Sequence, residues 1–98
     1  MNQPQVQVSD VKAGCFVTTK FVLDKSEKTF VGLVLNKDKD ECEIKFMRAK
    51  DAKKTVFIFR EPEDKSWVDN EQIVSILLTP SMGNRDRYIF PGSVNGAE

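Results

Sequence analysis

The sequence contains no histidine and only two cysteines among its 98 residues. Without histidine, the commonest general base and a frequent zinc ligand are missing, as are the serine and cysteine triads that use an imidazole. The two thiols, Cys15 and Cys42, do not form a C-x-x-C pair, and we expect both to be buried and free. We therefore expect a protein that is not an enzyme, has no catalytic residue, cofactor or metal site, and works in a reducing, intracellular setting.

Long apolar runs and an excess of charge are also missing. No apolar run approaches the ~20 residues that a membrane helix needs, and the N-terminal stretch has neither the basic nor the apolar region of a signal peptide. Fifteen basic residues balance fifteen acidic ones, so the net charge gives no attraction toward nucleic acid or an anionic membrane. We expect one globular domain with no membrane partner.

The sequence does contain a series of β-strand patterns. Residues 29–46 combine an apolar run, a short charged break and an alternating return, which is typical of a β-hairpin. In the return strand Cys42, Ile44 and Phe46 face one way, and the charged residues between them face the other. Other strands are predicted at residues 15–23, 55–60 and 73–78, with a short strand or strand edge at 67–69.

Three local features refine this picture. Gly32 inside the second strand indicates a bulge, a bend or a close approach of backbone. The charged segments 24–28 and 48–54 are predicted as solvated connections, the second of them as a loop or one helical turn. A one-turn 3₁₀ segment is predicted around residues 69–72, just before the last strand.

Five short strands, tight polar loops and almost no helical periodicity predict an all-β fold, a small five-stranded barrel. Closure of a barrel would also remove the exposed strand edges of an open sheet. Another small barrel, such as an OB-like one, is the main alternative. We expect a flexible N-terminal arm at residues 1–10, the barrel at 11–78, and an irregular tail at 79–98, which proline and glycine punctuate.

The order of these motifs resembles the SH3-like barrels of the Tudor, chromo and PWWP group. Gly14-Cys15-Phe16-Val17 is similar to the opening of a Tudor-type first strand, and Phe30 to Val34 is similar to the second, with Gly32 at its small-residue position. Glu43 to Phe46 is similar to a third strand that ends in an aromatic residue. Such modules occur in chromatin-linked and transposon-derived eukaryotic proteins, so the resemblance implies an interaction role and a nuclear location.

The resemblance also implies a candidate binding site. Tudor-like domains hold a methylated ammonium or guanidinium group in a cage of aromatic rings by cation–π attraction. Phe30 and Phe46 fall on two of the cage positions, whereas Leu23 and Ala49 stand near the positions of the other rings, where Phe21 or Trp67 could substitute. The candidate cage residues are Phe21, Phe30, Phe46 and Trp67. The alternative is that Phe30 and Phe46 are core residues that close one end of the barrel.

Three kinds of function remain open at this stage. A module that docks a protein or peptide ranks first, because a fold does not fix its ligand, and the contact points would be Tyr88-Ile89-Phe90 or the acidic connector 61–64. A reader of methylated lysine or arginine is the second. Nucleic-acid binding is the third, since basic side chains combined with aromatic rings suit single strands. The candidate nucleic-acid contacts are Arg48, Lys50, Lys53, Lys54, Arg85 and Arg87.

Overall fold

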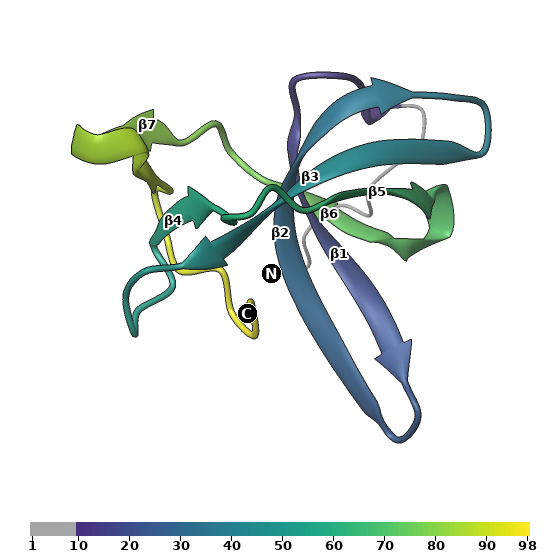
Figure 1. Ribbon diagram of the computed structural model, residues 1–98, viewed down its shortest axis with the longest axis horizontal. Helices are drawn as coiled ribbons and strands as arrows, with labels where there is room; N and C mark the ends of the chain where they lie inside the picture. The colour runs from purple at the N-terminus through teal and green to yellow at the C-terminus, as the bar shows by residue number, and fades with distance from the viewer. Residues whose placement is uncertain (1–9) are drawn as a thin grey trace, which may run out of the picture.

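The computed structural model describes residues 10–98, and all its regular elements are strands or short 3₁₀ turns. The predicted all-β class is therefore confirmed. The strands form an antiparallel sheet that curls strongly into a half-barrel (Figure 1). They are β1 (Phe16–Leu23), β2 (Ser26–Lys37), β3 (Glu41–Ala49), β4 (Val56–Phe59), β5 (Lys65–Asp69), β6 (Ile73–Ile76), β7 (Ser81–Met82) and β8 (Tyr88–Ile89). Apart from Asp10, the predicted N-terminal arm lies outside the described residues.

The curl is centred on the long hairpin of β2 and β3. β6 pairs with β1, and β1 pairs with β2. On its other side β3 has two partners, because β5 pairs with Glu41–Lys45 and β4 pairs with Met47–Ala49. β8 and β7 continue the sheet beyond β4. The sheet therefore divides into two wings that share β3 (Figure 1).

The first core fills the inner face of the half-barrel. Cys42, Ile44 and Phe46 are buried and Glu41 is exposed, so the alternation predicted for β3 is confirmed. Val11, Val17, Val34 and Val68 complete this core. Both cysteines are free, as expected, but only Cys42 is buried, whereas Cys15 is half-buried at the edge of this core. Burial raises the pKa of the Cys42 thiol, which keeps it protonated.

Gly32 faces this first core. A Cβ atom at this position would collide with Cγ2 of Ile44 and lie 3.0 Å from the carbonyl oxygen of Lys45. Of the three possibilities, the close approach of backbone is thus confirmed at Gly32. A register irregularity does occur in the same strand pair, but it lies between Val34 and Asn36.

A second core covers the opposite face of the sheet, and the C-terminal segment supplies much of it. Phe90, Val94 and Ala97 pack with Phe16, Val31, Met47 and Phe57. The backbone N–H groups of Phe90 and Val94 donate to the carbonyls of Thr55 and Lys54, both at 2.8 Å. The tail that was predicted to be irregular therefore packs on the sheet and contributes β7 and β8, and the structure has eight strands where the sequence predicted five.

Two predicted loops are partly strand. Ser26, Glu27 and Lys28 pair with β1, so the loop predicted at 24–28 shrinks to a turn in which Asp24 takes a φ of 50°. Both faces of this hairpin end are solvated, so its side chains carry no apolar alternation, and Lys20 pairs with Glu27 across the strands at 3.1 Å. The hairpin projects from the rest of the molecule (Figure 1). Likewise, Arg48 and Ala49 of the predicted 48–54 loop belong to β3.

The predicted 3₁₀ turn is confirmed as η2 (Asn70–Gln72). Its buried Asn70 donates from Nδ2 to the carbonyl of Lys39 at 3.0 Å and accepts from the thiol of Cys42 at 3.2 Å. These bonds attach the β2–β3 turn to the entry of β6.

Candidate functional site

Three phenylalanine rings meet at one end of the first core. Phe21, Phe30 and Phe46 come from β1, β2 and β3, and their ring centroids lie 5.5, 5.9 and 6.1 Å apart in edge-to-face contacts. They border a pocket of about 280 Å³, which we call the phenylalanine pocket. Its other lining residues are Leu23, Asp64 and Ser66. The structure thus brings together three of the four candidate cage residues.

The three rings differ in burial. Phe46 is 5% exposed and belongs to the first core, whereas Phe21 and Phe30 are half-buried at its edge. Gly32 stands opposite Phe46 in the register of β2 and β3 and adds no side chain of its own there. Phe46 therefore forms a fixed floor, and Phe21 and Phe30 keep ring surface available to a ligand.

The acidic connector reaches the rim of this pocket through backbone hydrogen bonds. The N–H of Phe46 donates to the carbonyl of Asp64 at 2.8 Å, and the N–H of Arg60 donates to the carbonyl of Phe46 at 3.2 Å. Asp64 and Ser66 are exposed. The pocket is therefore apolar within and carries one carboxylate at its edge, and sequence reasoning named the connector as a contact point without placing it beside the rings.

Phe30 also interacts with a cation of the protein itself. The guanidinium carbon of Arg60 lies 5.2 Å from the centroid of the Phe30 ring. Nε of Arg60 is buried and has no hydrogen-bond partner among the described residues. Since Arg60 is not part of the pocket lining, this contact supports Phe30 from outside the pocket.

The fourth candidate ring is not part of the pocket. Trp67 is 46% exposed and stands opposite Glu43 in the pairing of β5 with β3. Its neighbour Val68 is buried in the first core, so alternation along β5 turns Trp67 to the outer face. Leu23 lines the pocket and Ala49 packs against the second core, so neither of these positions supplies a ring.

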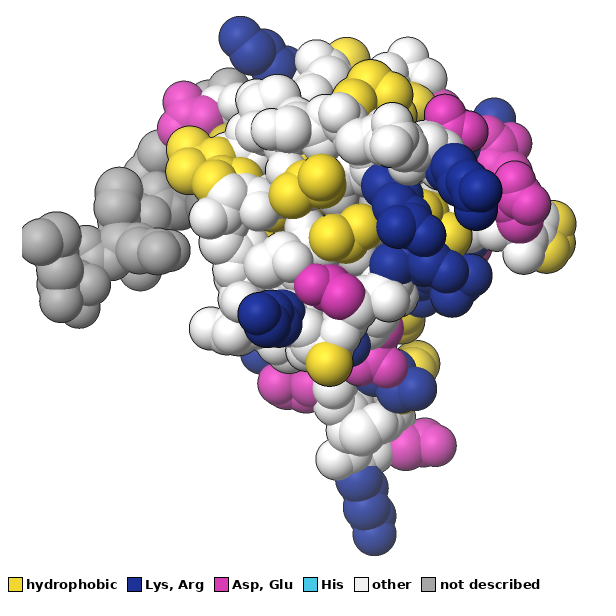
Figure 2. Space-filling model, turned by 90° about the vertical axis from the view of Figure 1, so that its left-hand side faces the viewer, with side chains coloured by type: hydrophobic (Ala, Val, Ile, Leu, Met, Phe, Trp, Pro, Cys, Tyr) yellow, Lys and Arg dark blue, Asp and Glu magenta, His cyan; other side chains and the backbone are white. Residues whose placement is uncertain are grey.

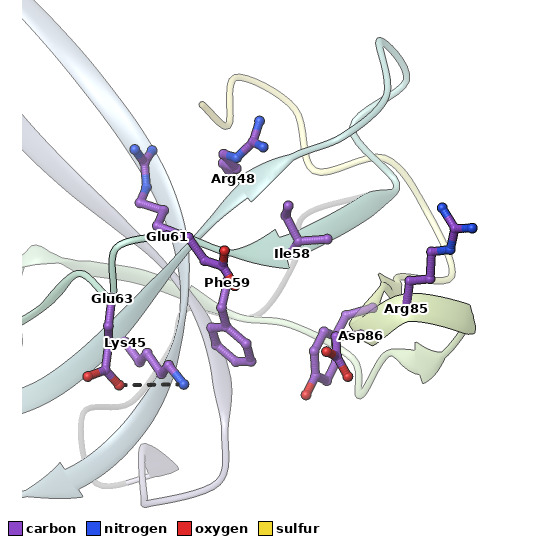
Figure 3. A pocket seen from close by; sticks show the side chains of 10 residues that line it. Lys45, Arg48, Ile58, Phe59, Glu61, Glu63, Arg85 and Asp86 are labelled. Atoms are coloured by element: carbon purple, nitrogen blue, oxygen red, sulfur yellow. Dashed lines mark ion pairs between the residues drawn. The ribbon is translucent and has the colours of Figure 1, made fainter.

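A second concavity, which we call the cleft, lies between β3, β4 and the turn η3 (Asn84–Asp86) (Figure 3). It has a volume of about 610 Å³. Lys45 pairs with Glu63 at 3.5 Å, and its Nζ lies 4.4 Å from the ring centroid of Phe59. The lining residues are Lys45, Arg48, Ile58, Phe59, Arg60, Glu61, Glu63, Arg85, Asp86 and Tyr88. Sequence reasoning proposed Arg48 and Arg85 as contacts but missed Lys45 and Arg60, which come from the sheet pairing.

The other basic candidates lie outside the cleft. Lys50, Lys53 and Lys54 belong to the β3–β4 connection, and Arg87 is exposed after η3. Asp51 fixes this connection, because its carboxylate accepts from the hydroxyl of Thr55 at 2.6 Å and from the N–H of Val56 at 3.0 Å. These hydrogen bonds lower the pKa of Asp51 from 3.8 to about 2, and the bond from the Thr55 side chain makes the largest contribution.

Within residues 10–98, no three histidine, cysteine, aspartate or glutamate side chains gather in a way that could hold a metal ion. The same part of the chain has no helix that is long and apolar enough to cross a membrane. Comparison of the chain with protein-family models, with curated proteins and with solved structures found no match.

Proposed function

We propose that this protein is a non-enzymatic, Tudor-like interaction module that docks a peptide. In this proposal the phenylalanine pocket accepts a methylated lysine or arginine side chain of that peptide. The observation that carries the proposal is the meeting of Phe21, Phe30 and Phe46 beside the carboxylate of Asp64. A pocket of about 280 Å³ lies just below the range of sites for drug-sized ligands, which suits a single side chain.

The chemistry of the pocket favours a methylated cation over a bare one. Methylation keeps the positive charge but removes N–H groups that water would otherwise solvate, so less hydration is lost on entry. The faces of the rings then attract the cation, by about 0.5–1 kcal/mol at an exposed site and ~2 kcal/mol when the ion is desolvated. The carboxylate of Asp64 adds attraction of the opposite charge at the rim. Since phenylalanine is a weaker partner than tryptophan or tyrosine, we expect modest affinity.

We further infer an SH3-like barrel for the part built by β1, β2, β3, β5 and β6. The order of these strands, the 3₁₀ turn before β6, and the return of β6 to pair with β1 support this inference. β4 is then an addition that pairs with the second half of β3. The nuclear, chromatin-linked setting is proposed on the resemblance to Tudor-type barrels alone.

The direct test is an NMR titration of isotope-labelled protein with short peptides. One peptide carries trimethyl-lysine or dimethyl-arginine, a second carries the unmodified residue, and a third carries the neutral tert-butyl isostere of trimethyl-lysine. We expect chemical shifts to change at Phe21 and Phe30 with the methylated cations only. Equal binding of the neutral isostere would rule out the cation–π contribution, and an absence of shifts with both methylated peptides would refute the proposal.

Matched variants separate the ring from the carboxylate. Phe30→Leu keeps the site apolar but removes a ring, and Asp64→Asn removes the rim charge at an exposed position. Each change should weaken binding of the methylated peptide by ~5-fold, which corresponds to about 1 kcal/mol. Glu41→Gln, which removes an exposed carboxylate from outside the pocket, is the control and should leave affinity unchanged.

A further inference from the structure

The net charge of zero hides a separation of charge along the chain. Residues 45–60 and 85–87 together hold eight basic and two acidic residues, a net charge of +6. The rest of the chain holds seven basic and thirteen acidic residues, a net charge of −6. The balance of charge therefore does not describe the field near either part, and the positive part can attract a polyanion.

The fold gathers the positive residues on one side of the molecule. Met47 and Ala49 of β3 pack into the second core, so alternation turns Arg48 outward, next to Ile58 of β4. Lys50 follows on the same face, and its N–H donates to the carbonyl of Val56 at 2.8 Å. Figure 2 shows Lys and Arg side chains gathered on this side of the molecule. We call this surface the basic face: Arg48, Lys50, Lys53, Lys54, Arg85 and Arg87.

These cations are not neutralised by the protein. Of the eight basic side chains in the two segments, only Lys45 forms a salt bridge with another residue in the 10–98 range. Arg60 stacks on Phe30. Asp51, the acidic residue in the midst of the lysines, has its carboxylate occupied by Thr55 and Val56. The basic face therefore keeps its charge for an external anion.

The cleft beside the basic face has the chemistry to receive a nucleobase. Ile58, Phe59 and Tyr88 are its apolar and aromatic lining residues. Glu61 and Asp86 bring carboxylate oxygens to the same space (Figure 3). Carboxylates accept hydrogen bonds from the exocyclic amines of bases. An unstacked base of a single strand can enter a cleft of about 610 Å³, whereas the bases of a duplex are held within the stack.

We infer that the basic face and the cleft bind single-stranded nucleic acid. Arg48 and Arg85 contact phosphates on the two sides of the cleft, and the lysines of the β3–β4 connection extend the path of the backbone. A base of the strand lies in the cleft against Phe59 and Tyr88, whose ring centroids are 5.2 Å apart. This site is separate from the phenylalanine pocket and does not depend on the function proposed for that pocket.

The first experiment measures fluorescence anisotropy of labelled oligodeoxycytidylate and oligocytidylate, whose bases carry an exocyclic amine, with the full chain. With five phosphate contacts, the affinity should fall roughly 130-fold between about 50 and 200 mM salt, because the logarithmic slope for a single strand is about −0.7 per contact. Absence of binding at the lower salt concentration, or binding that does not respond to salt, would overturn the inference. Tighter binding of a duplex of mixed sequence would also overturn it.

The second experiment uses two double variants that remove the same charge. Arg48→Gln with Arg85→Gln should weaken binding by ~10-fold or more and flatten the salt slope by about 1.4. Lys25→Gln with Lys28→Gln, on the projecting hairpin, should change affinity by less than ~2-fold. All four side chains are exposed, so the folds should persist, and circular dichroism checks this. An equal loss of oligonucleotide affinity in both double variants would show that binding depends on net charge alone, and would overturn the inference.

The two proposed sites can fail separately. Phe21→Leu, which removes a pocket ring that does not contact Arg60 of the cleft, should weaken binding of the methylated peptide but leave oligonucleotide affinity unchanged. The Arg48 and Arg85 double variant should do the reverse. Loss of oligonucleotide binding in Phe21→Leu would contradict the assignment of nucleic acid to the basic face.

Discussion

Replacing Phe90 by alanine removes one ring from the second core, and the result will show whether the C-terminal segment belongs to the folding unit. Phe90 is 4% exposed. Its ring centroid lies 5.5 Å from that of Phe57 and 5.8 Å from that of Phe16, both in edge-to-face contact. The variant would leave a cavity between β4, β1 and the C-terminal segment.

The expected loss is large for a domain of this size. A buried Phe→Ala change costs about 3–5 kcal/mol, which includes the lost transfer free energy and the cavity. A chain of this length has a total free energy of unfolding of about 5–15 kcal/mol. At ~4–8 °C for each kcal/mol, the melting temperature should fall by roughly 12–40 °C.

Urea unfolding followed by two probes provides the assay. The single tryptophan, Trp67, lies on β5 in the other wing of the sheet, and circular dichroism reports on the whole sheet. Both probes should give the same lowered midpoint in Phe90→Ala. The control Ile89→Ala changes a neighbour that is 42% exposed and should cost less than ~1.5 kcal/mol. A Phe90→Ala midpoint equal to that of the wild type, or a Trp67 transition that does not move, would refute the reasoning.

Three other predictions concern the sheet and its turns. Gly32→Ala should cost about 1–3 kcal/mol because its Cβ would meet Ile44 and backbone, whereas Gly92→Ala, with nothing within 4 Å, should be neutral; equal urea midpoints would contradict this. Asn70→Ala should lower the free energy of unfolding by about 1–3 kcal/mol in the same assay, since it leaves the buried thiol of Cys42 and the carbonyl of Lys39 without their partner, and an unchanged midpoint would argue against those bonds. Asp51→Asn should be less stable than the wild type at neutral pH. Because the pKa of Asp51 is lowered in the folded state, the greater stability of the wild type is fully present above pH 3.8 and is lost as the pH falls to about 2. A difference in thermal midpoints that persists at the lowest pH would contradict the hydrogen bonds assigned to the Asp51 carboxylate.

The features predicted correctly from sequence are those that a local pattern determines. The alternation of Cys42, Ile44 and Phe46 follows from the period of two residues along a strand, and it needs no knowledge of the partner. The role of Gly32 could be predicted because a glycine inside a strand usually indicates a bulge, a bend or a close approach of backbone. The turn at Asn70–Gln72 follows a strand edge with polar residues at its entry.

The remaining features depend on pairing between distant segments. Asp64 and Ser66 reach the rings because β5 pairs with β3, and nothing near these residues in the sequence indicates that partner. Phe90, Val94 and Ala97, which the C-terminal segment contributes to the second core, lie at uneven spacing in short segments between turns. No periodicity in the sequence therefore identifies them as core residues. The sequence did not predict the Ser26–Lys28 end of β2 as a strand, because a strand with both faces exposed to solvent shows no apolar alternation.

The sharing of β3 between two cores fixes its register more strongly than a single core would. Phe46 faces the first core, and Met47, its neighbour, faces the second. A slip of one residue would exchange the faces of the strand and turn the charged side chains of Lys45 and Arg48 toward apolar interiors. Phe46 and Arg48 lie two residues apart on β3, so the alignment that seats Phe46 among the rings also points Arg48 to solvent, and neither surface can be assembled without the other.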